Sequence, residues 1–205
     1  MAKPSAFVKV PMDRIGALVG PEGFVKESIE KKFSVELQID SGTGDVTITL
    51  RADVNDPSLL FKAREVVTAI ARGFSPENAL RMLSKEEALL FIIDLHEIVG
   101  KSQSDMNRLK GRVIGQEGKT RRIIEELTNA NITVYGHTIS IIGNMDELET
   151  AKEAVQMLLR GSQHRTVYRY LHRKRRELKE KRLELWEPTF SEKTETKPKR
   201  ANRRG

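Results

Sequence analysis

The sequence predicts an α+β protein made of two copies of one module, each a three-stranded sheet with three helices, followed by a basic C-terminal helix. Three observations support this class. Residues 15–39 recur without a gap as residues 110–134. Around both copies, the spacing of apolar residues switches between strand and helix periods in the same order. After residue 160, Lys and Arg dominate and apolar residues become sparse.

The first module is expected to run strand, helix, helix, strand, strand, helix. Val35, Leu37 and Ile39 alternate with polar residues, which predicts a half-buried strand. Asp56 before Pro57 is a good helix cap and first-turn pair. The expected elements are a strand at 6–10, helices at 12–20 and 24–33, strands at 34–40 and 46–50, and a helix from 57 that stops at Gly73.

The second module repeats this order, with a tight turn at Gly136. Its expected elements are a strand at 91–99, helices at 104–114 and 119–129, strands at 131–135 and 138–142, and a helix at 146–160. Residues 75–90 look helical, with Ser75 as cap, and are apolar enough to pack against a module. The predicted division is a first domain at 1–73, a helical connector at 74–90, a second domain at 91–161, and at 162–205 a basic helical extension that ends in a disordered tail.

Charge is concentrated at the C-terminus. Residues 160–182 carry ten Lys or Arg against two Glu, a net +8, whereas residues 1–159 carry 20 basic and 23 acidic residues, a net −3. Such a basic segment favours a polyanionic partner, although it could also be a solvated tail that only aids solubility. The chain has no Cys, and no apolar stretch approaches the roughly 18 residues that span a bilayer, so we expect a cytoplasmic protein without membrane contact.

Each copy contains a Gly-x-x-Gly turn between two helices. Taken alone, such a turn is equally well explained by a glycine that ends a helix. Here the turn occurs twice, each time after an apolar pair and before an apolar-faced helix. Because Gly115 and Gly118 lack a Cβ, a sugar-phosphate chain could approach the backbone and the N–H groups of the next helix. Three basic residues, Lys119, Arg121 and Arg122, follow within four positions.

The stretches "IGALVGPEGFVKESI" and "KGRVIGQEGKTRRII" resemble the KH domain, a module that binds single-stranded nucleic acid, in the form that begins with a strand and ends with a helix (βααββα). This resemblance implies RNA binding, with the glycine loop clamping about four backbone nucleotides. No cofactor is implied. The RNA-binding residues expected in the second module are Val113, Ile114, Gly115, Gln116, Glu117, Gly118, Lys119, Thr120, Arg121, Arg122 and Ile132.

The two glycine loops differ in charge. Residues 101–122 have a net charge of +5, whereas residues 9–32 have +1, and Pro21 removes a backbone donor from the first loop. We therefore expect the second module to be the main RNA site. A secondary contact with RNA or protein is expected at Gly20, Pro21, Glu22, Gly23 and Lys26. Further sequence-independent contacts are expected from the basic residues Arg173, Lys174, Arg175 and Arg176.

Residues 5–185 are similar to the archaeal relatives of the ribosome-assembly factor called partner of Nob one. The resemblance implies binding to the 3′ region of 16S ribosomal RNA during small-subunit assembly. It also implies two protein partners, the endonuclease that processes that 3′ end and the alpha subunit of initiation factor two. The chain departs from the eukaryotic pattern by keeping a full Gly-x-x-Gly in its first module.

Other classes of function fit the sequence less well. No nucleophile pattern occurs, and no Gly-Lys-Ser/Thr follows either loop, so an enzyme is not expected. Asp94, His96 and Glu97 suggest a metal cluster, but alternation along a strand would send Glu97 to the opposite face, so no metal site is predicted. The alternatives left open are a general single-stranded RNA or mRNA-binding regulator and a protein-interaction scaffold.

Overall fold

The computed structural model describes residues 4–54, 56–83, 85 and 87–186. It confirms the α+β class and the two three-stranded antiparallel sheets. Within these ranges, no helix is both long enough and apolar enough to cross a membrane. The tail predicted to be disordered, residues 194–205, lies outside the described residues.

The first sheet and its helices come from residues 5–71. The elements are β1 (Ser5–Lys9), α1 (Met12–Val19), a short 3-10 turn at Pro21–Gly23, α2 (Phe24–Phe33), β2 (Val35–Ile39), β3 (Asp45–Leu50) and α3 (Pro57–Ala71). The Asp56 carboxylate accepts a hydrogen bond from the Ser58 N–H at 2.9 Å, as expected of the helix cap. The strand order is β1-β3-β2.

The second sheet and its helices follow α4 (Pro76–Leu83). The elements are β4 (Leu89–Asp94), α5 (His96–Val99), α6 (Gln103–Ile114), a 3-10 turn at Gln116–Gly118, α7 (Lys119–Thr128), β5 (Asn131–Tyr135), β6 (Thr138–Gly143), α8 (Met145–Leu159) and α9 (His164–Trp186). The strand order is β4-β6-β5, which matches the order of the first sheet.

Two of the predicted elements in this region were wrong. The strand expected at 91–99 ends at Asp94, because the Asp94 carboxylate accepts a hydrogen bond from the His96 N–H at 2.8 Å and turns the chain into α5. The connector expected to be helical over residues 75–90 is helical only from Pro76 to Leu83, and its last two residues begin β4.

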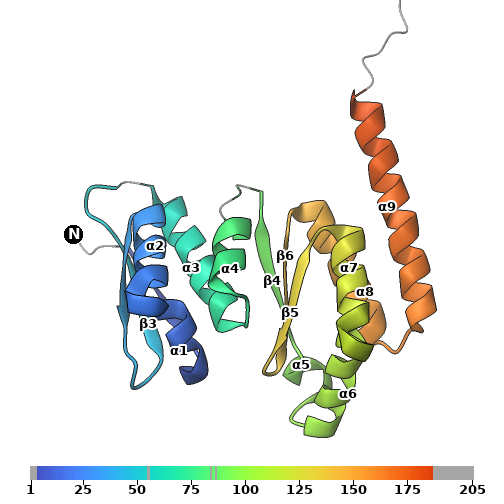
Figure 1. Cartoon of the computed structure of the whole chain (residues 1–205), viewed down its shortest axis with the longest axis horizontal. Coiled ribbons are helices and arrows are strands. Elements are labelled where there is room, and N and C mark those ends of the chain that lie inside the picture. The colour runs from blue at the N-terminus through green and yellow to red at the C-terminus, as the bar shows by residue number, and fades with distance from the viewer. Residues whose placement is uncertain (1–3, 55, 84, 86, 187–205) are drawn as a thin grey trace, which may run out of the picture.

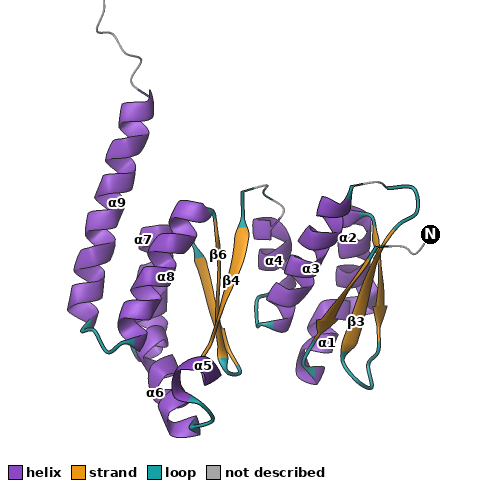
Figure 2. Ribbon diagram, turned by 180° about the vertical axis from the view of Figure 1, so that it is seen from behind, coloured by secondary structure: helices purple, strands orange, loops and turns teal. Residues whose placement is uncertain are grey.

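The two sheets and their helices stack in four layers, in the order sheet, helices, sheet, helices (Figures 1 and 2). Helices α3 and α4 therefore lie between the sheets. Ala79 and Leu83 of α4 are fully buried, and Ile142 of β6 belongs to the same apolar cluster as the first sheet. The connector packs against the second sheet and holds the two parts together, as expected from its apolar sequence.

The basic helix α9 is partly a core element. Val167 and Leu171 are fully buried in the apolar cluster of the second sheet, where α9 lies beside α7 and α8. The domain boundary predicted at residue 161 leaves α9 outside the second domain, although α9 contributes to the core of that domain. Positions 167 and 171 are four residues, or about one helical turn, apart, so both side chains lie on one face of the helix. Two apolar side chains on that face are enough to bury one edge of an otherwise basic helix.

Candidate nucleic-acid interface

The two glycine loops have nearly the same backbone. Gly115 ends α6 with φ 73° and ψ 178°, and Gly20 ends α1 with φ 73° and ψ 177°. The central Glu of each loop, Glu117 or Glu22, has a positive φ close to 50°. Gly118 and Gly23 then adopt the left-handed conformation and begin α7 and α2. Any difference in function between the loops must therefore come from their side chains.

The two glycines of the second loop are needed for different reasons. A Cβ on Gly115 would lie 2.2 Å from Thr120 Oγ1 and 2.8 Å from the Thr120 backbone nitrogen, so this position is closed by the protein itself. A Cβ on Gly118 would meet nothing nearer than the Arg122 guanidinium at 3.8 Å. Gly115 therefore allows α6 and α7 to pack closely, while Gly118 leaves open space at the start of α7.

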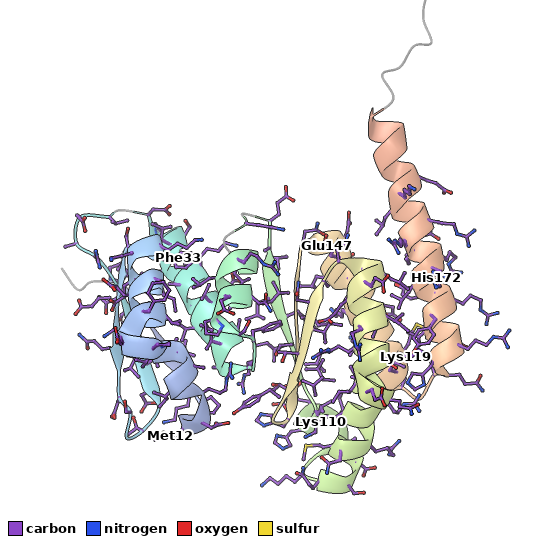
Figure 3. The ribbon with its side chains drawn as sticks, in the orientation of Figure 1. Met12, Phe33, Lys110, Lys119, Glu147 and His172 are labelled. Carbon is purple, nitrogen blue, oxygen red and sulfur yellow. The ribbon has the colours of Figure 1, made fainter. Side chains whose placement is uncertain are left out.

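The start of α7 has the features of an anion-binding helix terminus. No side chain caps its first N–H groups, and the helix dipole places partial positive charge there. Lys119 is exposed, and Figure 3 shows it at the beginning of α7. The Arg122 guanidinium donates to the Glu117 carbonyl, which braces the turn while the side chain remains exposed.

Arg121 points to a different side of α7. Its Nε lies 3.6 Å from the Glu125 carboxylate, and Glu125 in turn accepts a hydrogen bond from the Ile132 N–H at 2.8 Å. Together with Ile132 and Thr133 of β5, these residues line a groove of about 290 Å³. The opposite wall comes from the segment after α3, at Gly73, Phe74, Ser75 and Asn78. The groove therefore combines both halves of the chain, which the sequence did not reveal.

A second hollow, of about 440 Å³, lies on the other side of the loop, between α6, α7 and α9. Arg108, Lys119 and Gln116 line it together with His164 and Tyr168 of α9. Tyr168 OH lies 3.0 Å from Thr120 Oγ1, so α9 is hydrogen-bonded directly behind the loop. Sequence reasoning missed Arg108 and Tyr168; the available signal was the pair of apolar positions at 167 and 171, which indicates the buried edge of α9.

Three predicted RNA contacts need correction. The Ile132 side chain is 3% exposed and belongs to the second core, so it cannot serve as a base contact. The Val113 side chain is fully buried in the second core, so it cannot touch RNA. The Thr120 side chain is 3% exposed and bonded to Tyr168, which leaves only its backbone for a ligand. Val113 and Thr120 lie on the buried faces of their helices, at the helical spacing of the apolar residues. The prediction assigned them to the RNA-binding loop although they belong to the core. Of the other predicted positions, Gln116, Glu117, Lys119 and Arg122 are exposed.

The first loop presents a different surface. Phe24, at the position of Lys119, is 69% exposed, and Pro21 and Glu22 are exposed beside it. Lys26 lies 3.8 Å from the Glu30 carboxylate, which reduces the charge that it can offer to an anion. This loop has the geometry of a phosphate clamp with little of its positive charge.

The predicted basic residues of α9 fall into two pairs. Arg173 and Lys174 both contact the Glu177 carboxylate, at 3.6 Å and 2.7 Å. The hydrogen bond from Lys174 to Glu177 raises the pKa of the lysine. Arg175 and Arg176 are exposed. The latter two are better placed to meet a nucleic acid.

Potential metal ligands converge at one place within the described ranges, where Asp94 and His96 meet His137. The sequence suggested Glu97 rather than His137 beside Asp94 and His96, and a metal site was not predicted because Glu97 was expected on the opposite face. Alternation along an extended strand does not apply after Asp94, where the chain turns into α5, and the β5–β6 hairpin brings His137 back to Asp94.

Together, the stacked sheets, the glycine loop and the open helix start define a nucleic-acid-binding module of the KH class. Residues 89–176 match the family model described as the eukaryotic type KH-domain (KH-domain type I), in the version for the second such domain of PNO1 proteins. This match includes the first half of α9, in agreement with its place in the core.

The chain belongs to the PNO1/Dim2 family of KH-domain proteins. It is 48% identical over 184 residues to the KH domain-containing protein MJ0443 of Methanocaldococcus jannaschii, covering 90% of this chain and 80% of that protein. The pre-rRNA-processing protein pno1 of Schizosaccharomyces pombe is 29% identical over 64% of this chain, which spans 56% of that protein.

Solved structures agree with this assignment. Dim2p from Pyrococcus horikoshii is 47% identical, with a TM-score of 0.78 over 83% of this chain and 99% of that one. The same protein has been solved in an a/eIF2alpha-aDim2p-rRNA complex, with 46% identity and a TM-score of 0.80 over 85% of this chain and 96% of that one.

Proposed function

We propose that this chain binds single-stranded RNA through its second glycine loop, and that its target is the 3′ region of small-subunit ribosomal RNA during ribosome assembly. The observation that carries the proposal is the open, uncapped start of α7, with Gly118, Lys119 and Arg122 around it. Backbone phosphates would lie against these residues, and the bases would turn toward the groove lined by Arg121, Asn131 and Thr133.

The family supports the choice of RNA. A relative is named a pre-rRNA-processing protein, and a solved relative was crystallised with rRNA and a/eIF2alpha. We propose the same two partners for this chain. The processing endonuclease remains a prediction from the family resemblance. The role is that of a binding protein, since relatives carry names of RNA-binding and RNA-processing factors.

We further propose that the chain has two KH modules, each with the strand-first βααββα order, separated by the connector at residues 74–90. The matched backbone of the two loops and the matched strand order of the two sheets support this division. The second module would include α9 up to about residue 176, where the family match ends. The first loop, at Gly20, Pro21, Glu22, Gly23 and Lys26, would make a secondary contact with RNA or protein.

The matched loops provide the test. Lys119→Glu and Phe24→Glu place a glutamate at equivalent positions of the two loops, each exposed on a helix start; the charge changes by −2 at Lys119 and by −1 at Phe24, so Lys119→Gln, which changes it by −1, is measured beside them. Fluorescence polarisation would use an RNA with the 3′-terminal sequence of the small-subunit rRNA from the organism that encodes the chain. We expect Lys119→Glu to weaken binding at least about tenfold, because repulsion replaces attraction at a phosphate, and Phe24→Glu to weaken it less than about threefold.

A larger effect of Phe24→Glu would move the main site to the first loop. An RNA of permuted sequence with the same composition separates the remaining alternatives. Equal affinity for both RNAs would indicate a general single-stranded RNA binder, and the absence of affinity for either would indicate a protein-interaction scaffold.

A further inference from the structure

Three potential metal ligands converge where β4 ends and the β5–β6 hairpin turns. Asp94 closes β4, His96 begins α5, and His137 lies in the turn between β5 and β6. The ligand atoms of these three side chains all lie within 4.8 Å of one another. His96 Nδ1 is 3.6 Å from Asp94 Oδ1, and His137 Nε2 is 3.7 Å from Asp94 Oδ2.

The backbone holds this arrangement in place. Asp94 and Thr138 are paired across the β4–β6 ladder, and the Leu95 N–H donates to the His137 carbonyl at 2.8 Å. Lys110 of α6, labelled in Figure 3, donates to the Gly136 carbonyl at 2.8 Å and anchors the turn. The positions of both histidines relative to Asp94 are thus set by main-chain hydrogen bonds, and only side-chain rotations remain to be adjusted.

The spacing fits a bound cation better than direct pairing. Both nitrogen–oxygen distances are longer than a hydrogen bond, so the imidazoles and the carboxylate face each other without being bonded. A tetrahedral ion with ligands at about 2.0–2.2 Å separates its ligand atoms by about 3.3–3.5 Å. The Asp94 carboxylate faces one imidazole with each oxygen: Oδ1, which also accepts the His96 N–H, faces His96, and Oδ2 faces His137. The imidazole rings are stacked with centroids 4.3 Å apart and an interplanar angle of 20°, so one ring must rotate about its side-chain bonds before both can direct a nitrogen to a shared ion.

We propose that Asp94, His96 and His137 bind a divalent transition-metal ion, with zinc as the expected ion. Two imidazole nitrogens and one carboxylate oxygen form a donor set that suits zinc and its neighbours and is poor for magnesium. The three side chains are between 36% and 42% exposed, so an ion can enter and a fourth position stays open to solvent. The nearby Lys110 ammonium repels a bound cation. We therefore expect the affinity of the site for zinc to be moderate.

Metal binding would link three segments that meet the first half of the chain. Tyr135, two residues before His137, donates a hydrogen bond to Asp13 of α1, and the Arg14 guanidinium lies 5.8 Å from the centre of its ring. An ion bound at His137 would join the hairpin that carries Tyr135 to the end of β4. The site would therefore stiffen the junction between the two halves.

The test is a zinc titration of the chelator-treated full chain without an affinity tag, in competition with a chromophoric zinc indicator. We expect micromolar or tighter binding of one ion, at least tenfold weaker binding for His96→Ala and for His137→Ala, and a rise of the thermal midpoint with zinc that both of these variants lose. His172→Ala, on the exposed side of α9, is the matched control and should bind zinc within twofold of the wild type.

Cobalt offers a second measurement, because its visible spectrum reports nitrogen and oxygen ligands directly and should lose intensity in both histidine variants. A wild type that binds zinc only above about 1 mM would overturn the proposal, as would threefold or smaller effects of both histidine substitutions. Loss of binding in His172→Ala would place the ion elsewhere. Equal competition by magnesium would exclude an imidazole site.

Discussion

The two glycines of the second loop should respond differently to the same substitution. Gly115→Ala adds a methyl group against Thr120, whose backbone nitrogen would lie only 2.8 Å away and cannot rotate aside. Gly118→Ala adds a methyl group to open space. A loop that served only to end one helix and begin another would need both glycines for the same conformational reason. A loop that receives phosphate needs Gly118 for access as well.

The structure sets the size of each effect. The backbone of Gly115, with φ 73° and ψ 178°, lies in a region that other residues occupy at a cost of about 1–3 kcal/mol, and overpacking adds about 1–3 kcal/mol. Gly118, with φ 76° and ψ 11°, is in the ordinary left-handed region, where alanine costs about 1–2 kcal/mol. For a chain of this length, each kcal/mol lowers the thermal midpoint by about 2–4 °C.

Thermal unfolding and RNA binding of the two variants would be measured together. We expect Gly115→Ala to lower the midpoint by about 4–24 °C, and Gly118→Ala by about 2–8 °C with at least about tenfold weaker RNA binding at a temperature where it is folded. Gly20→Ala repeats the first substitution in the other loop, where the added Cβ would lie 2.4 Å from Val25 Cγ2. Equal midpoints for Gly115→Ala and Gly118→Ala, or unchanged RNA affinity for Gly118→Ala, would refute the division of roles.

Two further predictions concern single charges. Burial raises the pKa of Glu65 on α3, and the nearby Lys62 ammonium offsets this only partly. The ionised carboxylate of Glu65 therefore opposes folding at high pH. The protonated carboxyl makes its full stabilising contribution below the pKa of the unfolded chain, near 4.5. This contribution is lost as the pH rises through the higher pKa of the folded chain. Glu65→Gln should therefore match the wild type in urea unfolding at pH 3.5 and exceed it at pH 7; lower stability at pH 7 would contradict this. Arg175→Gln combined with Arg176→Gln should reduce the slope of log affinity against log salt by up to about 1.4, since each phosphate contact to a single strand contributes about 0.7, and an unchanged slope would remove these residues from the RNA interface.

The spacing of apolar residues and the residues that begin or end helices and turns predicted much of the fold. The helix expected at 24–33 has those bounds, because Gly23 begins it in the left-handed conformation and Ser34 ends it in the same conformation. The β5–β6 turn at Gly136 was likewise predictable, since glycine adopts its positive φ of 54° at low cost. In both places the local sequence and the tertiary structure favour the same conformation.

The predictions that failed depend on contacts between distant segments. The basic composition of α9 suggested a basic extension beyond the second domain, yet Val167 and Leu171 are fully buried and Tyr168 and Tyr170 pack against the same core. His137 joins Asp94 through the β4–β6 ladder, a pairing across more than forty residues that no local pattern encodes.

The outer faces of the two sheets differ in polarity, so the two halves could not exchange places. The outer face of the second sheet carries apolar residues, including Leu90 and Ile142, and the helices of the first half cover it. The corresponding face of the first sheet carries mostly polar side chains, with Phe7 as an exposed exception at 72%. The polar outer face of the first sheet is suited to water, whereas the apolar outer face of the second sheet is stabilised by the cover that the first half provides.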